Sequence, residues 1–285
     1  MTNTYTERVV SIESRDGFTL EGLQIVPAAP SGRTLLWIHG VYAAFYAPPG
    51  LEVCRALAAL GVMSVLGNTR GHNVGAWIRN RDGRVVLAGG AWESFAAAAH
   101  DLAGWVEFAD RLGPGVVLAG HSLGARKVTM YLATERDPRV NGLILASPSA
   151  RAGNIDGPSR KRAEELTARG EIAGLLPVED GWAASAANYL ERFAAGSVND
   201  AFSAEAPNEP LLGSVSVPVL ALLGGKERPS DSDARAEIEL LEQRARHAEA
   251  FRGEVIDGAD HLYTGKEHYV ACRIASWMRA LSHPA

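Results

Sequence analysis

Five short, almost continuous runs of apolar residues are the feature that most constrains how this chain of 285 residues can fold. They read TLLWIHG, VMSVLGNT, VVLAGH, VNGLILASP and VPVLALLGG and begin at residues 34, 62, 116, 140 and 217. Runs of this kind are typical of strands that are buried on both faces of a sheet. Helical patterns at about residues 50–60, 91–112 and 123–135 separate the first four. This alternation predicts an α/β fold with a mostly parallel sheet and helices on both of its faces.

Both ends of the chain extend this pattern. Near the start, ERVVSIES (7–14) and FTLEGLQIV (18–26) flank an Asp-Gly pair, which is a hairpin signal between alternating apolar residues. Near the end, a charged helix at about 232–249 is followed by the strand GEVIDGA (253–259) and a last helix at about 266–282. We therefore expect a central sheet of about eight strands, with the first hairpin as its antiparallel edge.

The interval 151–212 interrupts the alternation. It is rich in Ala, Arg, Glu, Gly and Pro, and no segment in it resembles a core strand. Its segment GWAASAANYLERFA places apolar and aromatic residues on one helical face. The predicted organisation is an α/β core of residues 1–150 and 213–285 with a helical cap insertion at 151–212. One long loop is the alternative, which is uncommon at this length in a compact domain.

Composition and charge exclude several classes of partner. The formal net charge is -5 and Lys and Arg do not cluster, so we expect no nucleic-acid binding. No apolar run approaches the ~20 residues of a membrane helix, and the N-terminus lacks a signal-peptide pattern. We expect a soluble, cytoplasmic protein without a membrane span. No cluster of potential ligands has metal-site spacing and no Gly-rich segment has a nucleotide-loop pattern, so we expect neither metal nor cofactor.

Gly-His-Ser-Leu-Gly at residues 120–124 lies where the run VVLAGH ends and a helical pattern begins. A sharp turn from strand to helix leaves no room for side chains near the serine, and Gly120 and Gly124 meet that need. The turn would lift the Ser122 hydroxyl to the carboxyl end of the sheet, at the N-terminus of the next helix. A tight turn with no further role is the alternative. Because the strand and the helix both flank this motif, we predict that Ser122 is a nucleophile.

These motifs resemble the α/β-hydrolase family. The resemblance covers nearly the whole chain and depends on His39-Gly40, on the Gly120–Gly124 motif and on Gly258-Ala259-Asp260-His261. It implies the α/β-hydrolase fold and an esterase-, lipase- or thioesterase-like activity. It also implies that His261, in a turn between a strand and the final helix, is the general base that activates the serine.

The resemblance implies Glu227 as the third member of a catalytic triad. Glu227 follows the run VPVLALLGG, where the family usually has an Asp, and its longer side chain is a departure from that pattern. Its role would be to fix the imidazole tautomer and to stabilise the imidazolium. Asp231 and Asp233 are the alternatives, although both look like capping residues of the next helix.

Two backbone amides are expected to form the oxyanion hole. They are those of Leu123, which follows the nucleophile, and of Val41, which follows His39-Gly40, with Tyr42 as the next option. Aromatic residues could line an acyl pocket, or could equally pack the insertion onto the core: Tyr42, Trp77, Trp182, Tyr189 and Phe193.

Together these residues predict a serine hydrolase that acts on a small-molecule acyl substrate. The expected substrate is a carboxylic ester, with a thioester or lactone close behind, and the route is an acyl-enzyme. The same residues would serve an acyltransferase or cyclase, or a ligand-binding protein with negligible turnover. The sequence leaves the acyl group, the alcohol and the oligomeric state open.

Overall fold

The fold comes from a computed structural model that describes residues 5–30, 32–148, 158–176, 183–192, 197–202, 210–227 and 231–281. The strands are β1 (Tyr5–Glu13), β2 (Thr19–Pro27), β3 (Thr34–Ile38), β4 (Ser64–Gly67), β5 (Ala76–Arg79), β6 (Val85–Ala88), β7 (Val116–His121), β8 (Val140–Ala146), β9 (Val219–Gly224) and β10 (Phe251–Ile256). The α-helices are α1 (Gly50–Ala59), α2 (Ala98–Asp110), α3 (Leu123–Glu135), α4 (Pro158–Ala168), α5 (Ala186–Arg192), α6 (Asp231–Arg244) and α7 (Glu267–Ala280). Short 3-10 helices are η1 (Val198–Ala201), η2 (Leu211–Ser214) and η3 (Gly225–Glu227).

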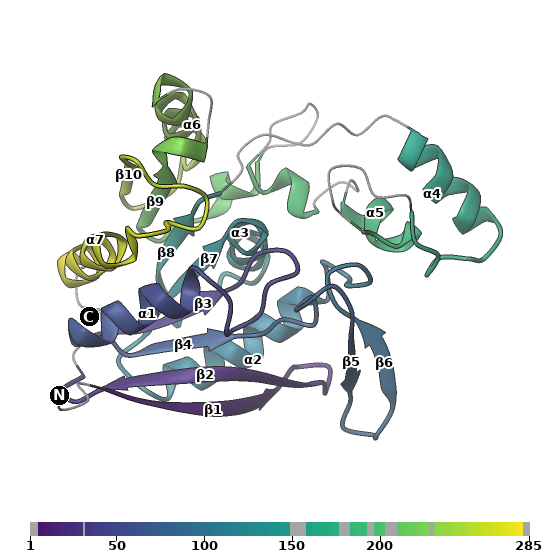
Figure 1. Cartoon of the computed structure of the whole chain (residues 1–285), viewed down its shortest axis with the longest axis horizontal. Coiled ribbons are helices and arrows are strands. Elements are labelled where there is room, and N and C mark those ends of the chain that lie inside the picture. Colours follow the sequence, from purple (N-terminus) through teal and green to yellow (C-terminus); the bar gives the residue numbers. More distant parts are fainter. Residues whose placement is uncertain are drawn as a thin grey trace.

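One eight-stranded sheet forms the centre of the molecule, in the order β1-β2-β4-β3-β7-β8-β9-β10 (Figure 1). The pairs β1–β2 and β2–β4 are antiparallel, and all pairs from β4 to β10 are parallel. The predicted sheet of about eight strands and its antiparallel edge are therefore confirmed.

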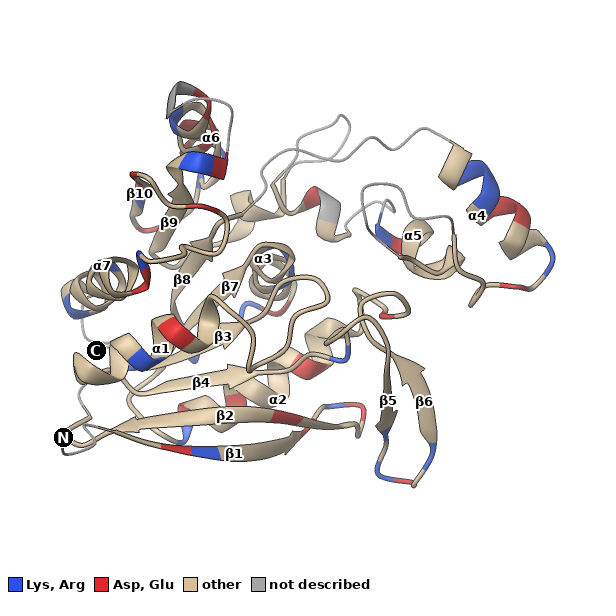
Figure 2. Ribbon diagram, viewed as in Figure 1, with Lys and Arg blue, Asp and Glu red and all other residues tan. Residues whose placement is uncertain are grey.

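Helices cover both faces of this sheet, as the apolar runs predict. On β3, Leu36 and Ile38 pack with residues of α2 and α3, whereas Leu35 and Trp37 pack with residues of α1 and α7. Strands β3, β4, β7 and β8 carry no charged residue (Figure 2). Burial on both faces thus explains why these strands are apolar at nearly every position.

Two local features differ from the sequence prediction. Strands β5 and β6 form a separate antiparallel hairpin that the sequence pattern did not indicate. Helix α2 begins at Ala98, although the helical pattern begins at residue 91. The reason is that the amides of Gly89 and Ala91 donate to the carbonyls of Arg70 and Val74, so the start of this stretch is bonded to a neighbouring loop and forms only turns before residue 98.

The interval between β8 and β9 contributes to three apolar clusters, one of which joins Val198 with Phe95, Leu123 and Met130. Helices α4 and α5 lie to one side of the sheet (Figure 1). They pack together in a small apolar cluster that includes Leu166 of α4 and Leu176 of the segment between the two helices. Phe202 and Leu212, which lie inside the predicted cap range, instead join the main core. A cap that spans the whole of 151–212 as one unit stays a prediction. Among the described residues, no helix has the length and apolar character needed to cross a membrane.

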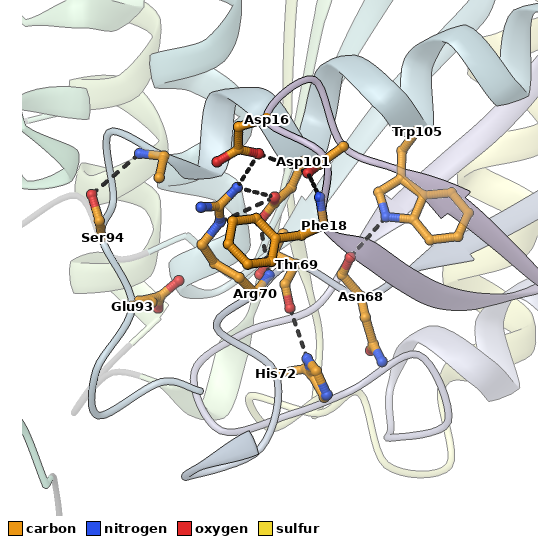
Figure 3. Close-up of polar contacts among 12 residues, drawn as sticks. Asp16, Phe18, Asn68, Thr69, Arg70, His72, Glu93, Ser94, Asp101 and Trp105 are labelled. Atoms are coloured by element: carbon orange, nitrogen blue, oxygen red, sulfur yellow. Dashed lines mark hydrogen bonds and ion pairs between the residues drawn. The ribbon is translucent and has the colours of Figure 1, made fainter. Parts of the chain in front are cut away.

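A buried ion pair fixes the loop that follows β4 (Figure 3). The guanidinium of Arg70 donates to Asp101 Oδ1 at 2.7 Å and to Asp16 Oδ1 at 2.8 Å, and the Arg70 amide donates to Asp101 Oδ2 at 2.8 Å. The guanidinium also lies over the ring of Phe18, 5.0 Å from its centroid. These contacts join the β4 loop, α2 and the β1–β2 turn at the end of the sheet where β3 and β7 also end.

We expect Asp101→Ala to lower the free energy of unfolding by about 3–5 kcal/mol, because it leaves the buried Arg70 guanidinium without its main counter-charge. Glu107→Ala is the matched control, since Glu107 lies on the same helix and pairs with Arg111 at the surface, where loss of a pair costs about 0–1 kcal/mol. Urea unfolding of both variants measures the difference. Equal losses would contradict the role given to Asp101.

Candidate active site

Three segments bring the predicted triad residues to one edge of the sheet. Ser122 follows β7, Glu227 ends the 3-10 turn after β9, and His261 lies in the loop after β10. Because these strands are parallel, their carboxyl ends meet at the same edge. The strand β8 lies between β7 and β9, so its end is also part of this edge.

Ser122 has a backbone conformation that few residues adopt. Its φ is 53° and its ψ is -119°, in the region that favours glycine. The two flanking glycines make this turn possible: a Cβ at Gly120 would lie 2.4 Å from the Gly124 carbonyl, and a Cβ at Gly124 would lie 2.5 Å from the His39 carbonyl oxygen. The sequence therefore allows a turn that a side chain at either glycine would prevent.

Glu227 and His261 are in hydrogen-bonding contact. His261 Nδ1 lies 2.6 Å from Glu227 Oε2, and the Glu227 side chain is only 2 % exposed. The other carboxylate oxygen, Oε1, accepts hydrogen bonds from Ser147 Oγ and from the Gly224 amide, both at 2.6 Å. These three contacts hold the carboxylate in one orientation, with one oxygen toward the imidazole.

The environment keeps Glu227 ionised. Burial raises the pKa of the Glu227 carboxyl, but hydrogen bonds from His261, Ser147 and the Gly224 amide, together with the charge on His261, hold that pKa below its usual value. A carboxylate only accepts hydrogen bonds. The proton of the Glu227–His261 contact therefore lies on Nδ1 of His261, and in the neutral imidazole Nε2 is left as a base.

His121 joins the turn at residues 120–124, called the elbow from here on, to the loop of His261. Its Nε2 donates to the His261 carbonyl oxygen at 2.8 Å, and the two ring centroids are 4.8 Å apart. Burial, and then the charge on His261, lower the pKa of His121 to about 4. Because His121 directly precedes Ser122, this contact brings the nucleophile candidate and the base candidate into one site.

The loop after β3 passes directly against the elbow. A Cβ at Gly40 would lie 3.1 Å from the Cβ of Ser122, and His39 Nδ1 donates to the Gly40 carbonyl at 2.7 Å. The side chains of Val41 and Leu123 lie in one apolar cluster. The two residues whose amides are predicted to form the oxyanion hole thus lie in the same apolar cluster.

The three aromatic candidates that the structure describes lie in different surroundings. The Tyr42 hydroxyl donates to the Ala183 carbonyl, and Tyr189 packs against the cluster of α4 and α5. Trp77 is 72 % exposed on the β5–β6 hairpin, away from the apolar cluster around Leu123. Trp182 and Phe193 lie outside the described residues.

Other carboxylates near the triad candidates have other surroundings. Asp260, which directly precedes His261, accepts the amides of Leu262 and Thr264 at Oδ1, at 3.1 and 2.9 Å, and so stabilises its own turn. Asp233 is half-buried on α6, and the side chain of Asp231 lies outside the described part of the chain. Within the described residues, no group of three or more His, Cys, Asp or Glu side chains is placed to hold a metal ion.

Two features of the site had no counterpart in the sequence reasoning. Ser147, at the end of β8, supplies a hydroxyl to Glu227; its position between the strands of the nucleophile and the acid could have indicated this. Lys127 on α3 forms a buried ion pair with Glu93. The helical pattern of α3 could not reveal that pair, because every residue from Leu123 to Leu132 is buried.

Comparison with known proteins identifies the family. The model of the alpha/beta hydrolase family matches residues 35–271. No curated protein matches the chain significantly. Similar solved structures include Est1E from Butyrivibrio proteoclasticus with bound ferulic acid (18% identity, 95% of this chain and 98% of that chain, TM-score 0.67). They also include the alpha/beta hydrolase GrgF from a Penicillium species (16%, 97% and 99%, 0.69) and an esterase from Pyrococcus furiosus (16%, 97% and 92%, 0.61).

We expect Ser122→Gly to be more stable than Ser122→Ala by about 1 kcal/mol. Glycine relieves a strained backbone conformation, worth about 1–3 kcal/mol, while its greater freedom in the unfolded chain offsets about 0.4–1 kcal/mol of that gain. Urea unfolding at neutral pH measures the order of the two variants. The reverse order would show that the turn at Ser122 is not strained.

We expect the stabilising effect of the Glu227 carboxylate to depend on pH. Its pKa is lowered in the folded state, so the contribution is fully present above the unfolded value of about 4.3 and is lost as the pH falls through the lower folded value. The difference in unfolding free energy between wild type and Glu227→Gln should therefore shrink between pH 6 and pH 3. Glu107→Gln, at an exposed carboxylate, should show no comparable trend.

Proposed function

The chain belongs to the alpha/beta hydrolase family, and on that premise we propose that it is a serine hydrolase that cleaves a carboxylic ester through Ser122, His261 and Glu227. The observation that carries the proposal is the 2.6 Å contact between Glu227 and His261, in a loop that His121 holds against the elbow of Ser122. A buried carboxylate, an imidazole and a serine at a strained turn are the parts of a triad, whatever the order in the chain.

Acylation begins with the transfer of a proton from the serine. His261, whose Nδ1–H donates to Glu227, accepts the Ser122 hydroxyl proton at Nε2 while the serine oxygen attacks the ester carbonyl. Glu227 stabilises the imidazolium that forms. Hydrogen bonds from the amides of Leu123 and Val41 stabilise the negative charge that develops on the carbonyl oxygen, and the Leu123 amide lies at the N-terminus of α3.

Release of the two products restores the site. The imidazolium of His261 returns its proton to the alkoxide oxygen, the bond from that oxygen to the carbonyl carbon breaks, and the alcohol leaves. A water molecule then gives a proton to His261 and attacks the acyl carbon. Collapse of the second tetrahedral intermediate breaks the bond to Ser122, and His261 returns the proton to the serine.

The surroundings of Ser122 support an apolar acyl group. Phe95, Leu123, Met130 and Val198 form a buried cluster beside the elbow, and apolar walls with few polar groups are usual in small-molecule sites. Est1E holds ferulic acid, and the Pyrococcus furiosus protein is an esterase, which supports an ester substrate.

Access of water supports hydrolysis over acyl transfer or cyclisation. The side chain of His261 is 48 % exposed, so water can approach the base that must activate it, whereas transfer to another acceptor requires that water be kept out. A panel of esters, thioesters and lactones of graded size, assayed with and without an added alcohol or amine, tests the chemistry. Acyl transfer as the main outcome would overturn the hydrolase proposal.

We expect Ser122→Ala to lower kcat/KM by about 10⁴- to 10⁶-fold and Glu227→Ala to cost less, because the imidazole can still act as a base without its carboxylate. Labelling by a fluorophosphonate probe should occur in the wild type and be lost in Ser122→Ala. Asp233→Ala is the control and should keep the wild-type rate. Loss of activity in Asp233→Ala with full activity in Glu227→Ala would contradict the triad proposed.

A further inference from the structure

We propose that Lys127, on the buried side of α3, is a positioning residue for the loop 39–42, which carries the predicted oxyanion donor. This inference rests on the proposed function. Its basis is a continuous set of polar contacts that runs from Lys127 through Thr69 and His39 to the carbonyl of Gly40.

The first contact is a buried ion pair. Lys127 Nζ lies 2.5 Å from Glu93 Oε2, and the two side chains are 1 % and 0 % exposed. The ammonium also donates to Thr69 Oγ1 at 3.2 Å, and it lies 5.9 Å from the centroid of the Phe95 ring. An ammonium has donors only, so the Thr69 hydroxyl must accept from it and can direct its own proton elsewhere.

Thr69 contacts His39 through both its amide and its hydroxyl. Its amide donates to His39 Nε2 at 3.1 Å, and its hydroxyl oxygen lies 3.4 Å from the same atom. Because Nε2 accepts, the proton of the neutral ring is on Nδ1, which donates to the Gly40 carbonyl at 2.7 Å. The peptide that ends in the Val41 amide is therefore held by one tautomer of His39.

The positive charge on Lys127 also favours the neutral form of the His39 ring. Burial, and then the charge on Lys127, lower the pKa of His39 to about 3. His39 is thus neutral at any pH where the proposed hydrolysis would proceed, and Nε2 stays an acceptor for Thr69.

Glu93 is itself fixed from the other side. Asn188 Nδ2 on α5 donates to the Glu93 carbonyl at 2.9 Å, and Glu191 Oε1 accepts from Ser94 Oγ and from the Ala96 amide, both at 2.8 Å. Hydrogen bonds from α5 therefore fix residues 93–96, the segment that contains the partner of Lys127. The path of contacts connects that helix with the loop beside Ser122.

Stability alone does not explain a charged pair in this place. Desolvation of two buried charges offsets most of their attraction, and apolar residues of similar volume often stabilise a core as well or better. What an apolar pair would not supply is a donor for Thr69. This difference separates a positioning role from a packing role and can be tested.

The test uses Lys127→Met/Glu93→Gln, which removes both charges of this ion pair together. We expect kcat on the best ester of the panel to fall about 10- to 100-fold with KM nearly unchanged, because a displaced oxyanion donor weakens the transition state more than the bound substrate. Tyr131→Phe is the control: Tyr131 lies on the same helix as Lys127, and its hydroxyl donates a buried hydrogen bond to Asp137, just beyond the helix. Loss of this bond should lower the melting temperature without changing kcat. An unchanged kcat in the double variant would overturn the proposal.

A second readout does not need turnover. In ¹⁵N-histidine-labelled wild type, assigned with a His39→Gln variant, His39 should give the signals of one Nδ1–H tautomer between pH 5 and 8. In the double variant these signals should shift toward the average of two tautomers. Unchanged signals would reject the role of Lys127 even if the wild type hydrolyses esters. A wild type without hydrolysis but with the expected shift would reject the proposed function and keep the positioning role.

Discussion

The close approach of two backbone segments at the end of β7 is the constraint on which the rest of the site depends. Gly124 lies so near the β3 end that a Cβ would meet the carbonyls of Ile38 and His39 at 2.5 Å, and Gly120 packs equally closely on Gly124. Only with both glycines can α3 begin directly after the strand. That start directs its N-terminus and the Ser122 side chain to the edge where Glu227 and His261 also lie.

Much of this arrangement could be predicted from the sequence, because it follows from the direction of the strands. Continuous apolar runs separated by helical patterns indicate parallel strands, and parallel strands place the residues that follow them at one edge. This explains why Ser122, Glu227 and His261 lie at one edge, whereas the choice of Glu227 and His261 came from the resemblance to the α/β-hydrolase family. The β5–β6 hairpin and the start of α2 at Ala98 depend instead on contacts between loops, such as that of Gly89 with Arg70, which no local pattern records.

The choice of Glu in place of Asp has a physical explanation that only the structure supplies. Glu227 ends a 3-10 turn that begins directly after β9, and its carboxylate folds back to accept the amide of Gly224. Because the side chain folds back toward Gly224, the additional methylene of Glu does not push the carboxylate past the imidazole. A Cβ at Gly224 would lie 2.9 Å from Glu227 Oε1 and 2.6 Å from the Asp260 carbonyl, so the glycine leaves room for the longer acid and for the loop of His261.

Three histidines lie near the elbow, and they differ in burial and in hydrogen-bond partners. His39 and His121 are buried, with pKa values lowered to about 3 and about 4, and each uses a ring nitrogen to hold a backbone carbonyl, that of Gly40 or that of His261. Both therefore stay neutral and serve as fixed donors. His261 is half exposed and faces an ionised carboxylate that can stabilise its protonated form. A general base must gain and lose a proton in each cycle, so the burial of His39 and His121 argues against that role for either of them, and the contact with Glu227 supports the proposal that His261 has it.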